Sequence, residues 1–176
     1  MDEGRVKVLG DAVRRDLGAP ELWPKWRGGW PNRADLALLD SVCSTRQRYE
    51  ATVLPKVYEW RNKYPTPATP ELHYLSRIDE SEIREVFGNT VMPGGRSPYS
   101  QRKMKSVGVV ETARLLCAHE PRLASADDII TEVTNNERKR SVALLRETKG
   151  IGPATASYFL ILLDIDGVKV DNLLGS

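Results

Sequence analysis

The sequence has few of the side chains that build metal sites and disulfide frameworks. Its 176 residues include two cysteines and two histidines. Cys43 and Cys117 are far apart in the sequence, and neither belongs to a Cys-x-x-Cys pair. A zinc site or a disulfide framework is therefore not expected, and each cysteine is most simply a small buried apolar residue.

Long apolar runs are also absent. The longest, Tyr158–Leu163, is far shorter than the roughly 20 residues that a transmembrane helix needs. The N-terminal segment mixes acidic and basic residues and has no apolar region of the signal-peptide kind. We therefore expect a cytoplasmic protein that does not contact a membrane.

The length suits one well-buried domain, and two full domains are not expected. The net charge of +2 is too small to indicate a nucleic-acid partner by itself. Basic residues nevertheless form two clusters. A single cluster is usually a solvated helix face, but two clusters flanking one segment favour nucleic acid. The first cluster comprises Arg96, Arg102, Lys103 and Lys105, and the second comprises Arg138, Lys139, Arg140, Arg146 and Lys149.

Apolar periodicity and helix-end residues predict helices along almost the whole chain and no strand. Asn32 is expected to cap one helix, and Pro70 to be the first residue of another. Asp79 begins a segment that resembles a capping box, and Ser125–Asp128 is expected to cap a short helix. The expected helices cover residues 3–17, 35–43, 49–63, 98–117 and 139–148, and others begin near 70, 79, 125 and 153.

A turn-rich segment over residues 23–30 contains three tryptophans among prolines and glycines. The tryptophans either cover a small core from outside or supply an indole that lines a pocket and stacks on a base. Trp30 is the candidate for the second role, and we favour the first. We divide the chain into this N-terminal helix and Trp-rich segment, residues 1–33, and a main domain, residues 34–176.

The most informative segment is Leu145–Ala156. Gly150 suits the end of a helix, where a positive φ costs a glycine nothing, and Pro153 suits the first position of the next helix. The result is a tight helical hairpin. The hairpin leaves uncovered the N–H groups of Ile151, Gly152 and Ala154 at the N-terminus of the second helix. Such a helix end can bind an anion, for example a phosphate of a nucleic-acid backbone. For a lone Gly-x-Gly, an ordinary turn between helices would be the simpler interpretation.

This segment, an apolar helix and Val168–Asp171 together resemble the signature of the helix-hairpin-helix DNA glycosylases, in particular the endonuclease III and adenine glycosylase branch. Upstream, Tyr99–Lys105 resembles the family's Tyr…Lys-Ala helix, and Asp35–Gln47 resembles its helix and base-wedging loop. The match covers Ala34–Asp171. The resemblance implies an all-α, glycosylase-like helical bundle, here with a minimal or absent second subdomain.

The resemblance assigns the catalytic role to Asp171. Cleavage of an N-glycosidic bond builds positive charge on the sugar, which a nearby carboxylate stabilises, and the nucleotide must first leave the stack. Asp171 could instead cap a terminal turn, whereas Asp164 and Asp166 look like the polar end of the preceding helix. The backbone-binding residues that the resemblance implies are Lys149, Gly150, Ile151, Gly152, Ala154 and Thr155.

Other site residues follow from the same resemblance. Ser44, Arg46 and Gln47 interrupt the helical pattern at the wedge position, although a capping turn with solvated ends explains them equally well. Trp30 is the candidate for the base pocket. Further basic contacts are expected from Arg96, in the long loop of residues 88–98, and from Arg102 and Lys103.

The sequence departs from the family pattern at three points, and each departure leads to an expectation about the protein. Strand-nicking members use a hairpin lysine where this chain has Ala154, so no Schiff base can form there and a monofunctional enzyme is implied. The four cysteines of an iron–sulfur cluster are missing, and no cofactor is expected, although a monovalent cation can bind at such a hairpin. The sequence ends at Ser176, where relatives continue; either the segment before Ala34 replaces that support or the chain is shortened.

The sequence therefore predicts a monomeric, monofunctional DNA glycosylase that releases a damaged or modified base from double-stranded DNA and leaves an abasic site. Base-excision repair in the nucleoid, or defence against phage DNA with modified bases, are the settings such an activity would serve. The alternative is a helix-hairpin-helix DNA-binding adaptor without catalysis. A helical module that binds proteins is a third interpretation.

Overall fold

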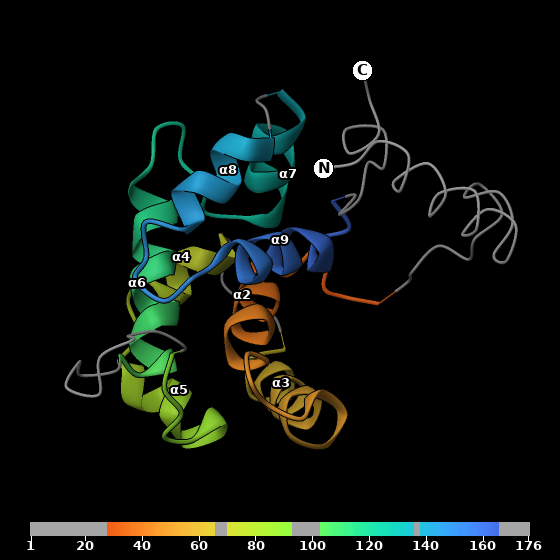
Figure 1. The fold of residues 1–176 in the computed structure, drawn as a ribbon, viewed down its shortest axis with the longest axis vertical. Helices are drawn as coiled ribbons and strands as arrows, with labels where there is room; N and C mark the ends of the chain where they lie inside the picture. Colours follow the sequence, from red (N-terminus) through yellow and green to blue (C-terminus); the bar gives the residue numbers. More distant parts are fainter. Residues whose placement is uncertain (1–27, 66–69, 93–102, 136–137, 166–176) are drawn as a thin grey trace, which may run out of the picture. The chain divides into compact units, whose positions relative to one another are not determined.

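The computed structural model describes residues 28–65, 70–92, 103–135 and 138–165, with Arg138 and Lys139 described by their backbone alone. These residues are helical apart from their connections, and the only β pairing among them is an isolated antiparallel bridge between Val91 and Met104. The all-α class predicted from the sequence is confirmed (Figure 1).

The described helices all belong to one compact unit. They are α2 (Ala34–Cys43), the π-helix η2 (Tyr49–Val53), α3 (Leu54–Lys63), α4 (Glu71–Leu75), α5 (Glu80–Phe87), α6 (Lys105–Ala118), α7 (Ala126–Asn135), α8 (Arg138–Leu145) and α9 (Pro153–Leu162). Within the described ranges, none is both long and apolar enough to cross a membrane.

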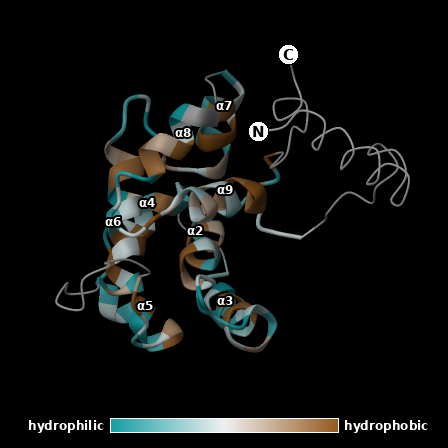
Figure 2. Ribbon diagram, viewed as in Figure 1, coloured by the Kyte–Doolittle hydropathy of each residue, from teal (hydrophilic) through white to brown (hydrophobic). Residues whose placement is uncertain are grey.

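Helix α2 is the centre of the core. All ten of its residues are buried, including the polar residues Asp35, Asp40 and Ser41. It packs against α9, α3, α6 and α4, and Figure 1 shows α9 crossing the upper end of α2, with α3 below α2. Burial of a leucine such as Leu36 or Leu39 contributes about 2 kcal/mol. In Figure 2 the C-terminal end of α9 is brown, whereas the more peripheral α5 is mostly teal.

Two helix starts are fixed by the capping residues that the sequence predicted. The Asp79 carboxylate accepts a hydrogen bond from the N–H of Ser81 at 2.8 Å, and α5 begins at Glu80, directly after Asp79. At the start of α7, the Ser125 hydroxyl accepts from the N–H of Asp128, whose carboxylate accepts from the N–H of Ser125 at 2.9 Å. This is a reciprocal capping box.

Two other expected helix starts are wrong by one residue. The residue before α2 is Arg33, not Asn32, and its side chain makes no capping bond; instead it forms a bidentate pair with Asp35. Pro70 precedes α4 in extended conformation rather than forming its first residue.

Helix α6 begins later than predicted. We expected it to start near Pro98, but Lys103 and Met104 precede it in non-helical conformation, and Lys105 is its first residue. The N–H of Met92 donates to the Lys103 carbonyl, and the N–H of Lys105 donates to the Thr90 carbonyl, both at 2.8 Å. Pairing with residues 90–92 thus takes the backbone groups that a longer helix would need.

Candidate nucleic-acid interface

The predicted hairpin is a connection of residues 146–152 between α8 and α9, here called the hairpin connection. The N–H of Ile151 donates to the Thr148 carbonyl at 3.1 Å, and Gly150, the third residue of that turn, has φ of +101°. A glycine is the residue that this position of a β-turn requires. The positive φ was predicted correctly, but Gly150 lies in a β-turn and not at the end of α8, which stops at Leu145.

The N-terminus of α9 is open. Pro153 is at the start of the helix, as predicted, and Gly152 before it provides no capping side chain. A Cβ at Gly152 would meet nothing within 4 Å. Among the described residues, no acceptor binds the N–H of Gly152, Ala154 or Thr155. The N–H of Ile151 is not free as we had expected, because it bonds to Thr148, and the Ile151 side chain is buried.

The side chains around this open helix end are polar and accessible. Lys149 and Arg146 are exposed, and in the described part of the chain neither forms an ion pair. Ala154 is exposed and Thr155 is half-buried. Free N–H groups at a helix N-terminus favour an anion. The exposed charged residues of the hairpin connection are Arg146, Glu147 and Lys149, two cations and one acid, so the net charge of the connection is positive.

The Ser44–Gln47 turn follows α2 directly, so the predicted interruption of the helix is confirmed. The N–H of Gln47 donates to the Ser44 carbonyl at 3.0 Å, and the Ser44 hydroxyl donates to the Ser41 carbonyl. Arg46 has φ of +57°, a conformation that costs a residue with a Cβ about 1 kcal/mol or more. Arg46 and Gln47 are exposed. Ser44 therefore serves the helix end, while a wedge role for the other two remains a prediction.

Met92 joins this turn to the hairpin connection. Its side chain lies so close to Gly150 that a Cβ there would be 3.0 Å from the Met92 Cβ. The same residue lines a cavity of about 290 Å³, here called the Met92 cavity. The cavity is lined by Thr45, Arg46, Gln47, Asn89, Thr90, Val91 and Met92. Met92 thus packs against the hairpin connection and also lines a cavity together with residues of the Ser44–Gln47 turn.

Trp30 covers the core rather than standing free. It is half-buried, and its indole N–H donates to a carboxylate oxygen of Asp40 at 2.9 Å. Its ring packs edge-on against Tyr58 with centroids 5.6 Å apart. These contacts match the core role that we favoured; its pocket role stays a prediction.

Asp40 is a buried acid that the sequence reasoning missed. Its relative exposure is 0%, and its Oδ2 accepts from Trp30 and from the Tyr49 hydroxyl, each at 2.9 Å. Oδ1 has no hydrogen-bond partner in the part of the chain that the structure describes. Burial raises the pKa of this carboxyl, and hydrogen bonds from Trp30, Tyr49 and Tyr158 partly counter the rise. The signal in the sequence that could have identified this buried acid is its position among the apolar residues of the α2 segment.

Lys105 was assigned to a basic surface cluster, and this is wrong. Its relative exposure is 2%, and its Nζ donates to the carbonyls of Cys43 at 2.9 Å and Thr45 at 2.7 Å. Burial lowers its pKa. Its neighbour Lys103 is half-buried and paired with Glu111, which reduces the charge that it can offer to DNA.

The remaining predicted residues fall into two groups. Asp171, Arg96 and Arg102 lie outside the described residues, as does Asp166. Asp164 is exposed just after α9 with φ of +60°, in agreement with its expected place in the turn that ends this helix.

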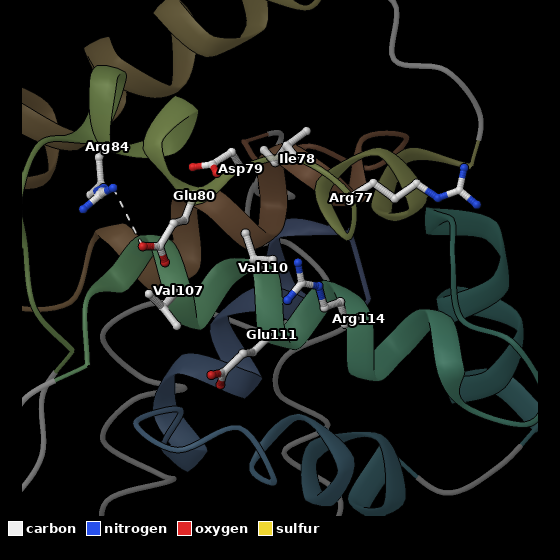
Figure 3. A pocket seen from close by; sticks show the side chains of 9 residues that line it. All are labelled: Arg77, Ile78, Asp79, Glu80, Arg84, Val107, Val110, Glu111 and Arg114. Carbon is white, nitrogen blue, oxygen red and sulfur yellow. Dashed lines mark ion pairs between the residues drawn. The ribbon is translucent and has the colours of Figure 1, made fainter.

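A larger cavity of about 580 Å³ lies between α5 and α6 and contains none of the predicted site residues (Figure 3). In Figure 3 Arg84 and Glu80 point toward each other, and their charged groups are 3.8 Å apart. The other lining residues are Arg77, Ile78, Asp79, Val107, Val110, Glu111 and Arg114. Its three arginines and three acids largely balance, so the lining favours neither sign of ligand charge.

Comparisons with known proteins give a family and no function. No curated protein and no solved structure matches the chain. A family model matches residues 7–175, which is nearly the whole sequence. The chain therefore belongs to the family described as a domain of unknown function, DUF8548.

Proposed function

We propose that the chain binds the phosphate backbone of double-stranded DNA through the hairpin connection and the start of α9. The observation that carries this proposal is the open helix end, where Gly152 leaves space in front of unpaired N–H groups. Exposed Lys149 and Arg146 outweigh exposed Glu147, so the hairpin connection carries net positive charge. A phosphate is the anion that such N–H groups and cations bind together.

We further propose that the bound DNA is the substrate of a monofunctional glycosylase. The resemblance assigns the catalytic role to Asp171. Its carboxylate would stabilise the positive charge that develops on the sugar while water replaces the base. The bond from the sugar to the base breaks, a bond to the water oxygen forms, and an abasic site remains. Ala154 carries no amine, so no covalent imine with the sugar can form at that position.

A DNA-binding adaptor without catalysis is the second candidate. It rests on the same open helix end and exposed cations, which supply groups for binding DNA and do not themselves require catalysis. Both candidates predict affinity for duplex DNA that falls steeply as salt concentration rises. They differ only in whether a base is released.

The deciding experiment incubates the protein with duplexes that carry oxidised, alkylated, mispaired or bulky modified bases, and then uses hot alkali to cleave at abasic sites. The glycosylase proposal expects strand cleavage after alkali for at least one duplex and none without alkali. Asp171→Asn should remove this activity and leave duplex binding unchanged. Binding without base release from any duplex would favour the adaptor, and no salt-dependent binding would refute both.

A further inference from the structure

We infer that Lys105 is a positioning residue that holds the Ser44–Gln47 turn beside the hairpin connection, so that Arg46 and Gln47 are presented to bound DNA. This inference rests on the proposed function for its DNA consequence. Its structural part, that one buried ammonium group sets the conformation of the turn, is testable without DNA.

The first support is the bonding of the ammonium group. Lys105 Nζ donates to the Cys43 carbonyl at 2.9 Å and to the Thr45 carbonyl at 2.7 Å. The Cys43 carbonyl is at the C-terminal end of α2, where the last carbonyls lack partners in their own helix and carry the negative end of its dipole. The Thr45 carbonyl belongs to the turn that follows. Among the described residues, no carboxylate pairs with this lysine, so these two carbonyls are what compensates its buried charge.

The second support is that Lys105 connects two walls of the Met92 cavity. Its side chain bonds to Thr45 on one wall, and its backbone N–H donates to the Thr90 carbonyl on the other at 2.8 Å. Thr45 and Thr90 both line the cavity, together with Met92, which packs against Gly150. A single residue thus fixes the turn and the 90–92 segment relative to the hairpin connection.

The third support is the conformation of Arg46, which follows Thr45 directly. Its φ of +57° is unfavourable for a residue with a Cβ. Exposed turns relax from such conformations unless their neighbours hold them. The bond from the buried ammonium group fixes the carbonyl of Thr45, the residue directly before Arg46, and adds to the bond from the Gln47 N–H to the Ser44 carbonyl that closes the turn. Without it, the turn is free to relax while α2 and the hairpin connection stay folded.

Amide hydrogen exchange on the free protein tests the structural part. The N–H of Gln47 donates to the Ser44 carbonyl and closes the turn, and Lys105→Met should speed its exchange by about tenfold. The N–H of Ser44 donates to the Asp40 carbonyl at the end of α2 and should keep its wild-type rate. Lys56→Met is the matched control, because Lys56 Nζ also donates to a helix-end carbonyl, that of Phe87, at 3.1 Å. Faster exchange confined to the turn in Lys105→Met supports the inference. Equal effects of the two substitutions, or faster exchange spread over all helices, would overturn it.

The DNA consequence is tested with a duplex that carries the fluorescent base 2-aminopurine beside a stable abasic-site analogue. Lys105→Met should keep its salt-dependent affinity within about twofold of the wild-type value, because the phosphate contacts are untouched. The fluorescence rise that reports local unstacking should fall about fivefold, in line with looser positioning of a wedge residue. Lys105→Arg, which can donate to both carbonyls, should restore most of the rise.

The controls separate this inference from the proposed function. If the wild-type protein neither binds the duplex nor changes its fluorescence, the proposed function fails, and the exchange experiment alone decides whether Lys105 holds the turn. If the wild-type protein does both and Lys105→Met retains the full fluorescence rise, the positioning role is refuted while DNA binding stands. Should Lys105→Met fail to fold, Lys105→Gln, which keeps one donor group, takes its place in both experiments with the same expected and contrary results.

Discussion

The side chain of Met92 lies against the backbone of Gly150, so closely that a Cβ at that glycine would be 3.0 Å from the Met92 Cβ and 3.1 Å from its Cε. Met92 is itself buried and is held by a backbone bond to Lys103. Gly150 is therefore needed for two independent reasons, its positive φ and the approach of this side chain. Segments 90–92 and 146–152 are fitted to each other at this contact.

Gly150→Ala should lower the free energy of unfolding by about 2 kcal/mol, because a Cβ is strained at φ of +101° and would also meet Met92. Urea unfolding measures this difference. Gly152→Ala is the control, since Gly152 has φ of −88° and open space around its Cβ position, and it should retain the wild-type stability. An equal loss in both variants would contradict this account of the connection.

Local sequence signals located the helix starts and turns whose causes are themselves local. Asp79 and Ser125 cap α5 and α7 as predicted, because a capping residue bonds to groups two or three positions away. The predicted start of α6 was wrong because the true start depends on the backbone pairing of Lys105 with Thr90, which lies on the other side of a loop. No helical periodicity reveals such pairing.

The same limit applies to the candidate site. Gly150 and Pro153 marked the hairpin connection from the sequence, yet nothing in the sequence placed Met92 against it. Lys105 looked like one more surface cation, but its partners Cys43 and Thr45 stand about sixty residues away. Tertiary contacts of this kind decide which charged residues are buried, and they override local composition.

Asp40→Asn should change how stability depends on pH. Burial raises the pKa of the Asp40 carboxyl in the folded state above its ordinary value of 3.8. The stability that proton binding contributes is fully present below that ordinary value and is lost as pH rises through the folded-state pKa. The variant lacks this loss. Its free energy of unfolding, relative to wild type, should therefore increase as pH rises above the ordinary value of 3.8 and become constant once the folded-state carboxyl is ionised.

Urea unfolding of the two proteins at several pH values measures this trend. The added amide group, which replaces an oxygen without a hydrogen-bond partner among the described residues, introduces an offset that does not vary with pH. Only the slope against pH therefore tests the prediction. A relative stability of the variant that stays constant or decreases with rising pH would show that Asp40 is already ionised at little cost.

Asp164→Gly should raise the free energy of unfolding by about 1 kcal/mol. The N–H of Ile165 donates to the Leu160 carbonyl and the N–H of Asp164 donates to the Ile161 carbonyl, the paired bonds of a Schellman motif. Asp164 occupies its left-handed position with φ of +60°, which glycine adopts without strain. Thermal unfolding should show a Tm above that of the wild type for Asp164→Gly and no such increase for Asp164→Ala. A gain in both variants would point to the loss of the charge instead.

Gly152→Ala offers the sharpest test of the proposed DNA contact, because its effects on stability and on binding should differ. The new methyl group meets no protein atom within 4 Å, so the fold has no reason to change. If the unpaired N–H groups of Gly152, Ala154 and Thr155 hold a phosphate, the methyl group stands where that phosphate approaches. We expect affinity for a short duplex to fall about tenfold, as for the loss of one well-placed phosphate contact.

Fluorescence anisotropy over a range of salt concentrations measures this affinity, with Asp164→Ala as the control for an exposed substitution beyond the opposite end of α9. The salt slope should also become less steep in Lys149→Ala, since fewer counterions are released when one cation is removed. Unchanged affinity in both Gly152→Ala and Lys149→Ala would place the DNA contact elsewhere on the protein. A loss of affinity in Gly152→Ala accompanied by a lower Tm would instead assign this glycine to the fold.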